Sequence, residues 1–458
     1  MRKFAAIALI IPHLALAEEP LLPAGLGDSS ELSLPMVLNS NTKQEIIAKQ
    51  VSDWKISLPF EFSGFVETRY GKRLQNDSTQ KSESIAEIRA QFSAEKSTDR
   101  VTAKLTADLL YDPVLDDYSN NLELGKGWLD LREASLLFYS SGNSDIKIGR
   151  QTLTWGTGDL LFINDLFPKD WNSFFIGRNE EYLKAPSDAV KFSYYTDIAN
   201  INFVYTPQFD SDRYLDGRRL SYYNRNLSRL AGSDAPIFVD RRIDIFSEDE
   251  ISIRLYRNIK SFEAALYYYN GYWKSPEGQN METGLYVFPK LSVYGASVRG
   301  PVASGIGNVE LGYYNSRDDE NGINASIRNS EWRFLVGYEK ELLHEFTGSF
   351  QYYLEHMDNY ENYKETAPSK SLKKDKNRHV VTVRLTKLLL NQNLTLSLFN
   401  YYSPSDNDGY IRSKVNYKLN DNWQAEIGAN IFYQNTHETF FGQLQNNSNI
   451  FVAFRYGF

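Results

Sequence analysis

Apolar and polar residues alternate one by one along many stretches of this chain, from about residue 60 to the last residue. In the final ten residues the two sets are Ile450, Val452, Phe454, Tyr456 and Phe458 on one face, and Ala453, Arg455 and Gly457 on the other. Successive side chains of an extended backbone point to opposite faces, so this segment is predicted to be a strand with one apolar face. The same period of two predicts strands over 101–109, 251–255, 332–338 and 423–431.

The polar face of nearly every predicted strand carries charged residues. So many charges cannot be buried in a dry core, because a buried charge loses its hydration. They can line a water-filled lumen if the apolar face contacts lipid, as in a transmembrane β-barrel. The charges expected to face the lumen are Arg69, Lys104, Lys191, Arg254, Arg299, Arg333, Arg384, Arg412, Lys414 and Arg455, with Glu67, Glu87, Asp108, Glu263, Glu310, Glu331, Glu355 and Glu426.

Eighteen strands are predicted, with sixteen as the alternative. They begin near residues 60, 84, 100, 129, 144, 188, 199, 249, 260, 291, 307, 328, 344, 377, 391, 408, 422 and 448. Connections after even-numbered strands are brief, whereas those after odd-numbered strands are mostly long, although residues 403–407 are a short exception. Short periplasmic turns that alternate with long outer loops are typical of membrane barrels. The sequence therefore predicts an all-β fold, a transmembrane antiparallel β-barrel.

The beginning of the chain has the features of a secretory signal peptide. Arg2 and Lys3 precede an apolar run that reaches Ala15-Leu16-Ala17. We therefore expect residues 1–17 to be a cleaved signal, 18–56 a periplasmic segment, and 57–458 the barrel. Beyond residue 17 no apolar run approaches the ~18 to 20 residues that a membrane helix needs. These features predict a location in the outer membrane of a Gram-negative bacterium.

Composition excludes several functions. Acidic residues outnumber basic ones and the formal net charge is -8, so nucleic acid is not an expected partner. The chain has no cysteine, which removes disulfides, thiolate metal sites and covalently attached c-type haem. We expect neither a bound cofactor nor enzymatic activity, because the histidines at 344, 356, 379 and 437 fall in different predicted hairpins and in no catalytic motif.

The C-terminal strand ends on an aromatic residue, Phe458. This feature resembles the signal by which outer-membrane barrels are recognised for insertion. The resemblance implies that the barrel-assembly machinery is a partner through this strand, and that outer-membrane lipid and lipopolysaccharide surround the folded protein.

A second resemblance rests on residues 131–156. Leu131-Arg132-Glu133-Ala134 is followed, after a predicted turn, by Ile148-Gly149-Arg150-Gln151 and Trp155-Gly156. This pair of strands resembles a pattern in porin-like outer-membrane proteins related to alginate-export porins. The resemblance implies that Arg132, Glu133, Arg150, Gln151 and Asp159 line the pore. The alternative is that Arg132, Glu133 and Arg150 form a cross-strand ion-pair network that fixes the register, with Gly149 at a β-bulge.

Two predicted loops carry charges that could narrow a pore. Arg218 and Arg219 belong to an arginine-rich loop after the seventh strand, and Asp165 and Asp170 belong to the loop after the fifth. Arginines in a lid could attract carboxylate or phosphate solutes. The alternative is that such mixed charges form a solvated outer surface.

A barrel of 16 to 18 strands leaves an aqueous channel. The sequence therefore predicts a porin-like channel for small hydrophilic solutes, and the slight basic surplus in the lumen favours anions. The alternative is a barrel that sheathes or anchors a periplasm-to-surface complex, such as multihaem cytochromes. The candidate pore-lining residues are Arg132, Glu133, Arg150, Gln151, Asp159, Arg254, Arg333, Arg384, Arg412 and Glu331.

Overall fold

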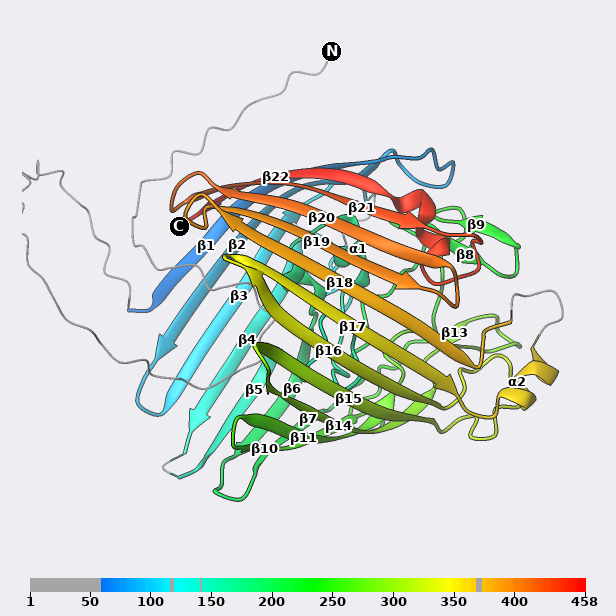
Figure 1. Ribbon diagram of the computed structural model, residues 1–458, viewed down its shortest axis with the longest axis horizontal. Helices are drawn as coiled ribbons and strands as arrows, with labels where there is room; N and C mark the ends of the chain where they lie inside the picture. Colours follow the sequence, from blue (N-terminus) through cyan, green and yellow to red (C-terminus); the bar gives the residue numbers. More distant parts are fainter. Residues whose placement is uncertain (1–58, 116–118, 141, 368–372) are drawn as a thin grey trace, which may run out of the picture.

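The computed structural model describes residues 59–115, 119–140, 142–367 and 373–458 (Figure 1). The expected signal peptide at 1–17 and periplasmic segment at 18–56 lie outside these residues, so both stay predictions.

Eighteen strands form a single sheet. They are β1 (Glu61–Arg73), β2 (Glu83–Ser97), β3 (Val101–Tyr111), β4 (Leu129–Tyr139), β5 (Ser144–Thr152), β6 (Pro186–Tyr194), β7 (Asn200–Thr206), β10 (Glu250–Ile259), β11 (Phe262–Tyr272), β14 (Lys290–Val302), β15 (Gly305–Ser316), β16 (Glu331–Leu343), β17 (Phe346–Met357), β18 (Asn377–Leu389), β19 (Leu394–Ser403), β20 (Asp408–Lys418), β21 (Trp423–Tyr433) and β22 (Asn449–Gly457).

Each of these strands pairs in antiparallel fashion with its neighbours in the chain, and β1 pairs with β22. The register between β1 and β22 runs from Phe65 opposite Gly457 to Arg73 opposite Asn449. The sheet is therefore a closed barrel with no free edge. The strand number of eighteen is confirmed, and every strand begins within three residues of its predicted start. The short hairpin between Ser403 and Asp408 is also present.

The two faces of each strand differ in the way that the alternation predicts. In β22, Ile450, Val452 and Phe454 are exposed on the outside, whereas Phe451 and Ala453 are buried on the inside. Apolar side chains cover the outer face of the other strands in the same way, including Leu105, Leu109, Leu266, Val336 and Ile427. An apolar exterior around a charged interior is stable only when lipid surrounds the barrel, so this is a transmembrane β-barrel. None of the described helices is long and apolar enough to cross a membrane.

The two ends of the barrel differ in their connections (Figure 1). Short turns and the C-terminus lie at one end, and long loops lie at the other. The loops contain the small elements β8 (Tyr222–Asn224), β9 (Arg229–Ala231), β12 (Gly278–Gln279), β13 (Tyr286–Val287), α1 (Trp171–Ile176), α2 (Tyr360–Thr366), η1 (Glu180–Leu183) and η2 (Gly442–Asn447). We call these the turn end and the loop end.

Phe458 completes the seam at the turn end. Its backbone N–H donates to the Gly64 carbonyl oxygen, and its carbonyl oxygen accepts from the Gly64 N–H, both at 2.9 Å. Its ring lies 6.0 Å from the ring of Phe62 and 6.1 Å from that of Phe92. The final residue therefore fixes the register in which the barrel closes.

Candidate functional site: a loop-filled lumen

The connection between β5 and β6, residues 153–185, folds into the barrel; we call it the inner loop. It contains α1, which begins at its N-cap residue Asp170, whose carboxylate accepts from the Ser173 N–H at 2.7 Å. The helix ends at Gly177, which has the left-handed φ of 91°. A side chain at Gly177 would be strained by this φ and would collide with the Phe451 ring on the barrel wall. The short helix is therefore packed directly against the wall.

Aromatic side chains hold α1 in the lumen. Phe175 is buried with its ring 5.7 Å from that of Tyr410 and 5.5 Å from that of Phe432, two residues of the opposite wall. Phe174 contacts the same Tyr410 ring at 5.6 Å. Burying an aromatic side chain of this size contributes about 1.5 to 3 kcal/mol. The inner loop and apolar side chains of the inner wall, such as Leu335 and Val380, thus form one shared hydrophobic core inside the barrel.

Glu310 of β15 is the main polar anchor of the inner loop. Its carboxylate accepts hydrogen bonds from Thr157 N–H, Thr157 Oγ1 (2.8 Å), Gly158 N–H (2.7 Å), Asn164 N–H (3.3 Å) and Asn164 Nδ2 (2.9 Å). All of its described partners belong to the inner loop. Hydrogen bonds to a charged acceptor are the strong ones, contributing about 1.5 to 3 kcal/mol each. Glu310 therefore fixes the loop's conformation as well as its position.

A second anchor lies on β17 and β18. The Asp159 N–H donates to Gln351 Oε1 at 2.7 Å, and Gln351 Nε2 donates back to the Asp159 carbonyl oxygen at 2.8 Å. The Asp159 carboxylate forms a bidentate pair with Arg384, at 2.6 and 2.9 Å. Arg384 also donates to Glu180 at 3.3 Å. One wall arginine therefore joins both halves of the inner loop.

Wall arginines bind the backbone beyond α1. Arg69 of β1 donates to the Gly177 carbonyl oxygen at 2.7 Å and pairs with Glu67 and Glu426. Arg412 of β20 donates to the Arg178 carbonyl oxygen at 2.7 Å, and its guanidinium lies 4.9 Å from the centre of the Phe174 ring. The inner loop is thus attached on several sides of the barrel.

The loop between β7 and β10, residues 207–249, also turns inward. Its Arg213 is buried and forms a bidentate pair with Asp130 of β4, at 2.7 and 2.8 Å, and a weaker pair with Asp170 at 3.3 Å. Arg219 pairs with Asp112 and donates to the Ser84 carbonyl oxygen at 3.1 Å. Arg213 therefore connects the 207–249 loop, the inner loop and the wall.

Asp210 holds the start of the 207–249 loop and should make its docking dependent on pH. Its carboxylate accepts from Ser187 Oγ at 2.6 Å and from the Asp188 N–H at 3.0 Å. Burial raises the pKa of the Asp210 carboxyl to about 7, and the Glu250 carboxylate adds to the rise. Since this value lies above the ordinary 3.8, the docked loop holds a proton that an undocked one releases. The protonated Asp210 carboxyl therefore stabilises the docked loop fully at low pH, and this stabilisation is lost as the pH rises towards 7.

We expect the 207–249 loop to resist proteinase K better at pH 5 than at pH 8, and Asp210→Asn to reduce that difference. Asp234→Asn, at an exposed residue of the same loop, is the matched control and should keep the wild-type dependence. Asp212, whose pKa is also raised by burial, accounts for the pH dependence of cleavage that remains in D210N. If D210N and wild type differ equally in protease resistance between pH 5 and pH 8, the pH dependence does not come from Asp210.

Arg132 and Glu133 both face the lumen, although they are adjacent in β4. The register against β3 shifts between Leu131 and Glu133, which makes Arg132 an extra residue in its strand. Arg132 donates to the Lys184 carbonyl oxygen at 2.7 Å and lies 5.0 Å from the Tyr182 ring. Glu133 pairs instead with Lys147 at 2.6 Å.

A bulge was expected at Gly149, but the register there is regular on both sides.

Arg150 differs from the expectation of a pore-wall position. It lies on the outer face of β5, between the exposed Ile148 and Thr152, and pairs with Asp188 at 2.5 and 2.9 Å. Neighbouring residues of a regular strand cannot share a face, and Gln151 occupies the inner one. The expected ion-pair network of Arg132, Glu133 and Arg150 is therefore absent, since each has another partner.

Gln151 points inward but is fully buried, and its Nε2 donates to the Ala189 carbonyl oxygen at 3.0 Å. Arg254 faces inward and pairs with Glu263 at 2.5 Å. Arg333 and Glu331 form an inward-facing pair at 2.6 Å, and the Arg333 guanidinium stacks 3.8 Å from the centre of the Tyr314 ring. These residues belong to the inner wall or to its packing, as the alternation predicts.

The four residues expected at a loop constriction divide into three groups. Asp165 and Asp170 lie in the inner loop, where Asp165 pairs with Lys169 at 3.0 Å and Asp170 caps α1. Arg219 belongs to the 207–249 loop and is buried, where it pairs with Asp112. Arg218 has a side chain that is 45% exposed and lies 3.7 Å from Asp216, so it belongs to the solvated outer surface. Adjacent arginines therefore have different environments.

These features can be compared with known proteins. No protein-family model and no curated protein sequence matches the chain. Several solved structures do match. OccAB4 of Acinetobacter baumannii has a TM-score of 0.52 and 10% sequence identity, and the match covers 89% of this chain and 100% of that chain. For OccAB1 of the same organism the TM-score is 0.51, the identity 9% and the coverage 87% of this chain and 96% of that chain, and for OccK3 of Pseudomonas aeruginosa these values are 0.50, 10%, 87% and 95%. The chain is similar in fold to these three proteins. The finer resemblance to alginate-export porins stays a prediction.

Buried guanidinium groups are less completely hydrogen-bonded than buried carboxylates. Among the described residues, seven buried guanidinium nitrogens in six arginines have no hydrogen-bond partner, whereas only two buried carboxylate oxygens do. The arginines are Arg132, Arg178, Arg254, Arg317, Arg378 and Arg412, and the carboxylates are Asp408 and Asp165, whose oxygen is nevertheless 3.0 Å from Lys169 Nζ. Two of the nitrogens, Nε and Nη1, belong to Arg412. These atoms are all shielded from solvent by the packed interior.

Gln351 was not among the candidate residues, Arg213 was expected only as one arginine of the loop after the seventh strand, and Glu310 only as one lumen charge among many. The inward positions of Glu310 in β15 and Gln351 in β17 follow from the alternation, whereas Arg213 lies in a loop to which the alternation does not apply. Their partners lie 153 residues away for Glu310 and Thr157, and 83 for Arg213 and Asp130. A pattern of period two carries no information about such distant contacts.

Proposed function

We propose that this protein is a porin-like channel of the outer membrane of a Gram-negative bacterium, through which small hydrophilic solutes diffuse. The observation that carries the proposal is the inner loop, which is folded into an eighteen-strand lumen and fixed to the wall by Glu310, Gln351 and Arg384. A barrel of this size without inward loops would be a wide pore. Loops of this kind narrow such a pore to a constriction that selects solutes. The fold shared with OccAB1, OccAB4 and OccK3 supports the proposal.

Conductance of the purified protein in a planar lipid bilayer tests this function. We expect discrete open steps whose size depends on the solute and the salt. A silent barrel that reaches the bilayer folded would overturn the proposal. The alternative of a sheath for multihaem cytochromes needs a lumen free for a partner protein, whereas the side chains of two loops pack against this wall. Co-purification with haem would favour the sheath.

The finer part of the proposal is a preference for anions. It is supported by the slight surplus of basic over acidic residues expected on the inner face of the strands. A cationic lumen raises the local concentration of anions, and this effect weakens as salt is added. Barrel assembly through the strand that ends at Phe458, and contacts with lipopolysaccharide, belong to the same proposal.

We expect Arg412→Gln to lower the anion-to-cation permeability ratio by about a factor of two or more. The measurement is the reversal potential in a salt gradient. Arg299→Gln is the control, because Arg299 is expected to face the lumen but lies near the turn end of β14, away from α1. If the wild-type channel prefers cations, the proposed preference for anions is wrong, but the proposal of a channel still stands.

A further inference from the structure

The end of the 207–249 loop exposes a group of large apolar side chains. Phe238, Ile243, Ile245 and Phe246 are 58%, 58%, 59% and 73% exposed. The lipid-facing Val452 is 50% exposed, so these loop residues are at least as accessible as strand residues that lie against lipid. Leaving such side chains in water is unfavourable, because apolar surface is more stable when it is removed from water. The exposed apolar surface of this segment would therefore be more stable in contact with an apolar partner than in water.

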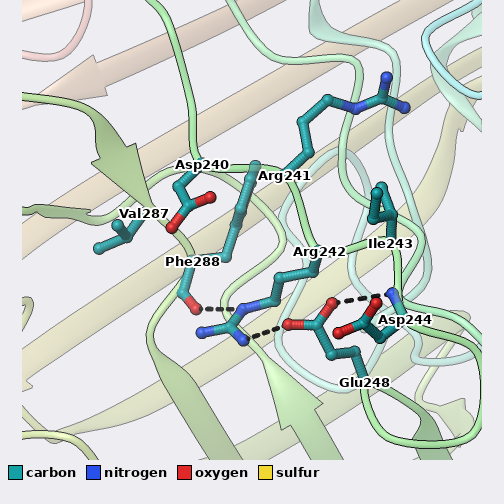
Figure 2. Close-up of a pocket in the computed structure, with 8 residues that line it drawn as sticks. All are labelled: Asp240, Arg241, Arg242, Ile243, Asp244, Glu248, Val287 and Phe288. Atoms are coloured by element: carbon teal, nitrogen blue, oxygen red, sulfur yellow. Dashed lines mark hydrogen bonds and ion pairs between the residues drawn. The ribbon is translucent and has the colours of Figure 1, made fainter.

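A polar clamp closes the base of the turn that begins at Ile243 (Figure 2). Arg242 donates through Nε to the Phe288 carbonyl oxygen at 3.0 Å and through Nη1 to Glu248 at 2.8 Å. Glu248 accepts in turn from the Asp244 N–H at 3.1 Å. The Arg242 guanidinium also stacks 4.1 Å from the centre of the Tyr272 ring. The turn 243–247 is thus closed at its base, and its apolar side chains cannot fold back into the loop core.

Phe246 has a strained backbone as well as an exposed ring. Its φ is +66°, a left-handed conformation that is unfavourable for a residue with a side chain. Strain of this kind persists only where the surrounding structure imposes it, and it is frequent at binding surfaces. Here the strained backbone keeps the most exposed of the four side chains at the tip of the turn.

The turn continues the lipid-facing surface of the barrel. The Phe246 N–H donates to the Pro207 carbonyl oxygen at 2.7 Å, directly beyond the last residue of β7. The next outward-facing pair below is Tyr205 opposite Ile251, followed by Phe203 opposite Ile253. The apolar turn therefore begins where the apolar wall of β7 and β10 ends.

We propose that Ile243, Ile245 and Phe246 insert into the outer leaflet of the membrane and contact lipid acyl chains next to the barrel. Continuity with the lipid-facing wall argues for lipid as the occupant. A second copy of the chain is disfavoured by area, because three such side chains bury at most about 500 Å² on one copy, whereas a stable interface buries about 600 to 1,000 Å² on each partner. This contact anchors the 207–249 loop from outside while Arg213 anchors it from inside.

The absence of cysteine makes a clean test available, because one introduced cysteine is the only thiol. Phe246→Cys is labelled with a nitroxide in vesicles of phosphatidylethanolamine and phosphatidylglycerol. Electron paramagnetic resonance then measures collisions with oxygen, which concentrates in lipid, and with a water-soluble nickel chelate. Ile427→Cys on the outer face of β21, 56% exposed, is the lipid control, and Leu227→Cys between β8 and β9, 48% exposed, is the water control.

We expect the label at 246 to give an oxygen-to-nickel collision ratio close to that at 427 and several-fold above that at 227. A ratio like that at 227 would overturn the inference, and so would spin–spin broadening that shows a second copy on the turn. Ile245→Cys serves as a second site if Phe246→Cys does not fold. The outcome is independent of the channel proposal, because lipid contact requires no conductance.

Discussion

Replacing Glu310 with alanine should raise the single-channel conductance by roughly a factor of two or more. The change removes the acceptor of all five hydrogen bonds that join Glu310 to Thr157, Gly158 and Asn164. Each donor left unpaired in the interior costs about 1 to 3 kcal/mol, so the first half of the inner loop should leave the wall to be solvated. A loop that leaves the wall no longer holds a fixed constriction. Conductance in planar bilayers and the variance of the open level measure both effects.

Two further variants separate this effect from a general loss of stability. Glu310→Gln keeps one acceptor oxygen and should fall between wild type and alanine. Glu95→Gln is the matched control, because Glu95 lies near the turn end of β2, where it pairs with Lys104 at 3.4 Å. Unchanged conductance in a folded Glu310→Ala barrel would show that Glu310 does not hold the constriction.

Arg213→Ala should release the 207–249 loop and give the largest gain in protease sensitivity. The substitution leaves the carboxylates of Asp130 and Asp170 buried without their guanidinium partner. Removing one partner of a buried ion pair costs about 3 to 5 kcal/mol, because the remaining charge has no compensation. The carboxylates regain hydration only if the loop opens. Proteinase K should therefore cut folded Arg213→Ala within residues 207–249 at least ten times faster than wild type, which corresponds to about 1.4 kcal/mol of lost docking.

Arg218→Ala is the matched control for Arg213→Ala. Arg218 lies in the same loop, but its exposed side chain forms only a long pair with Asp216, and exposed pairs contribute about 0 to 1 kcal/mol. We expect its cleavage rate to equal that of wild type. Equal rates for the two variants would mean that the loop is held by its apolar contacts, such as those of Phe209 with Tyr272 and Phe288.

The alternation of residues was sufficient to predict the barrel because strand geometry is local. The outward rows of β3, β16 and β21 and the eighteen strand starts all follow from the period of two and from the lengths of the connections. The same rule should have separated Arg150 from Gln151, since consecutive strand residues face opposite ways. Only the β4 bulge allows Arg132 and Glu133 to share the lumen, and no turn or glycine signal marks it.

The amino-acid sequence by itself determined which face of each strand meets lipid, how many strands close the barrel, and that charges fill the interior. It did not determine that two loops fold inward, or which charge pairs with which. Those contacts join residues such as Glu310 and Gly158, or Arg69 and Glu426, which are 152 and 357 positions apart. They form only when the barrel closes, because closure brings distant strands around one lumen. Local periodicity therefore determined the strands of the barrel and their two faces, whereas only the tertiary structure decided which loops and charge pairs fill the interior.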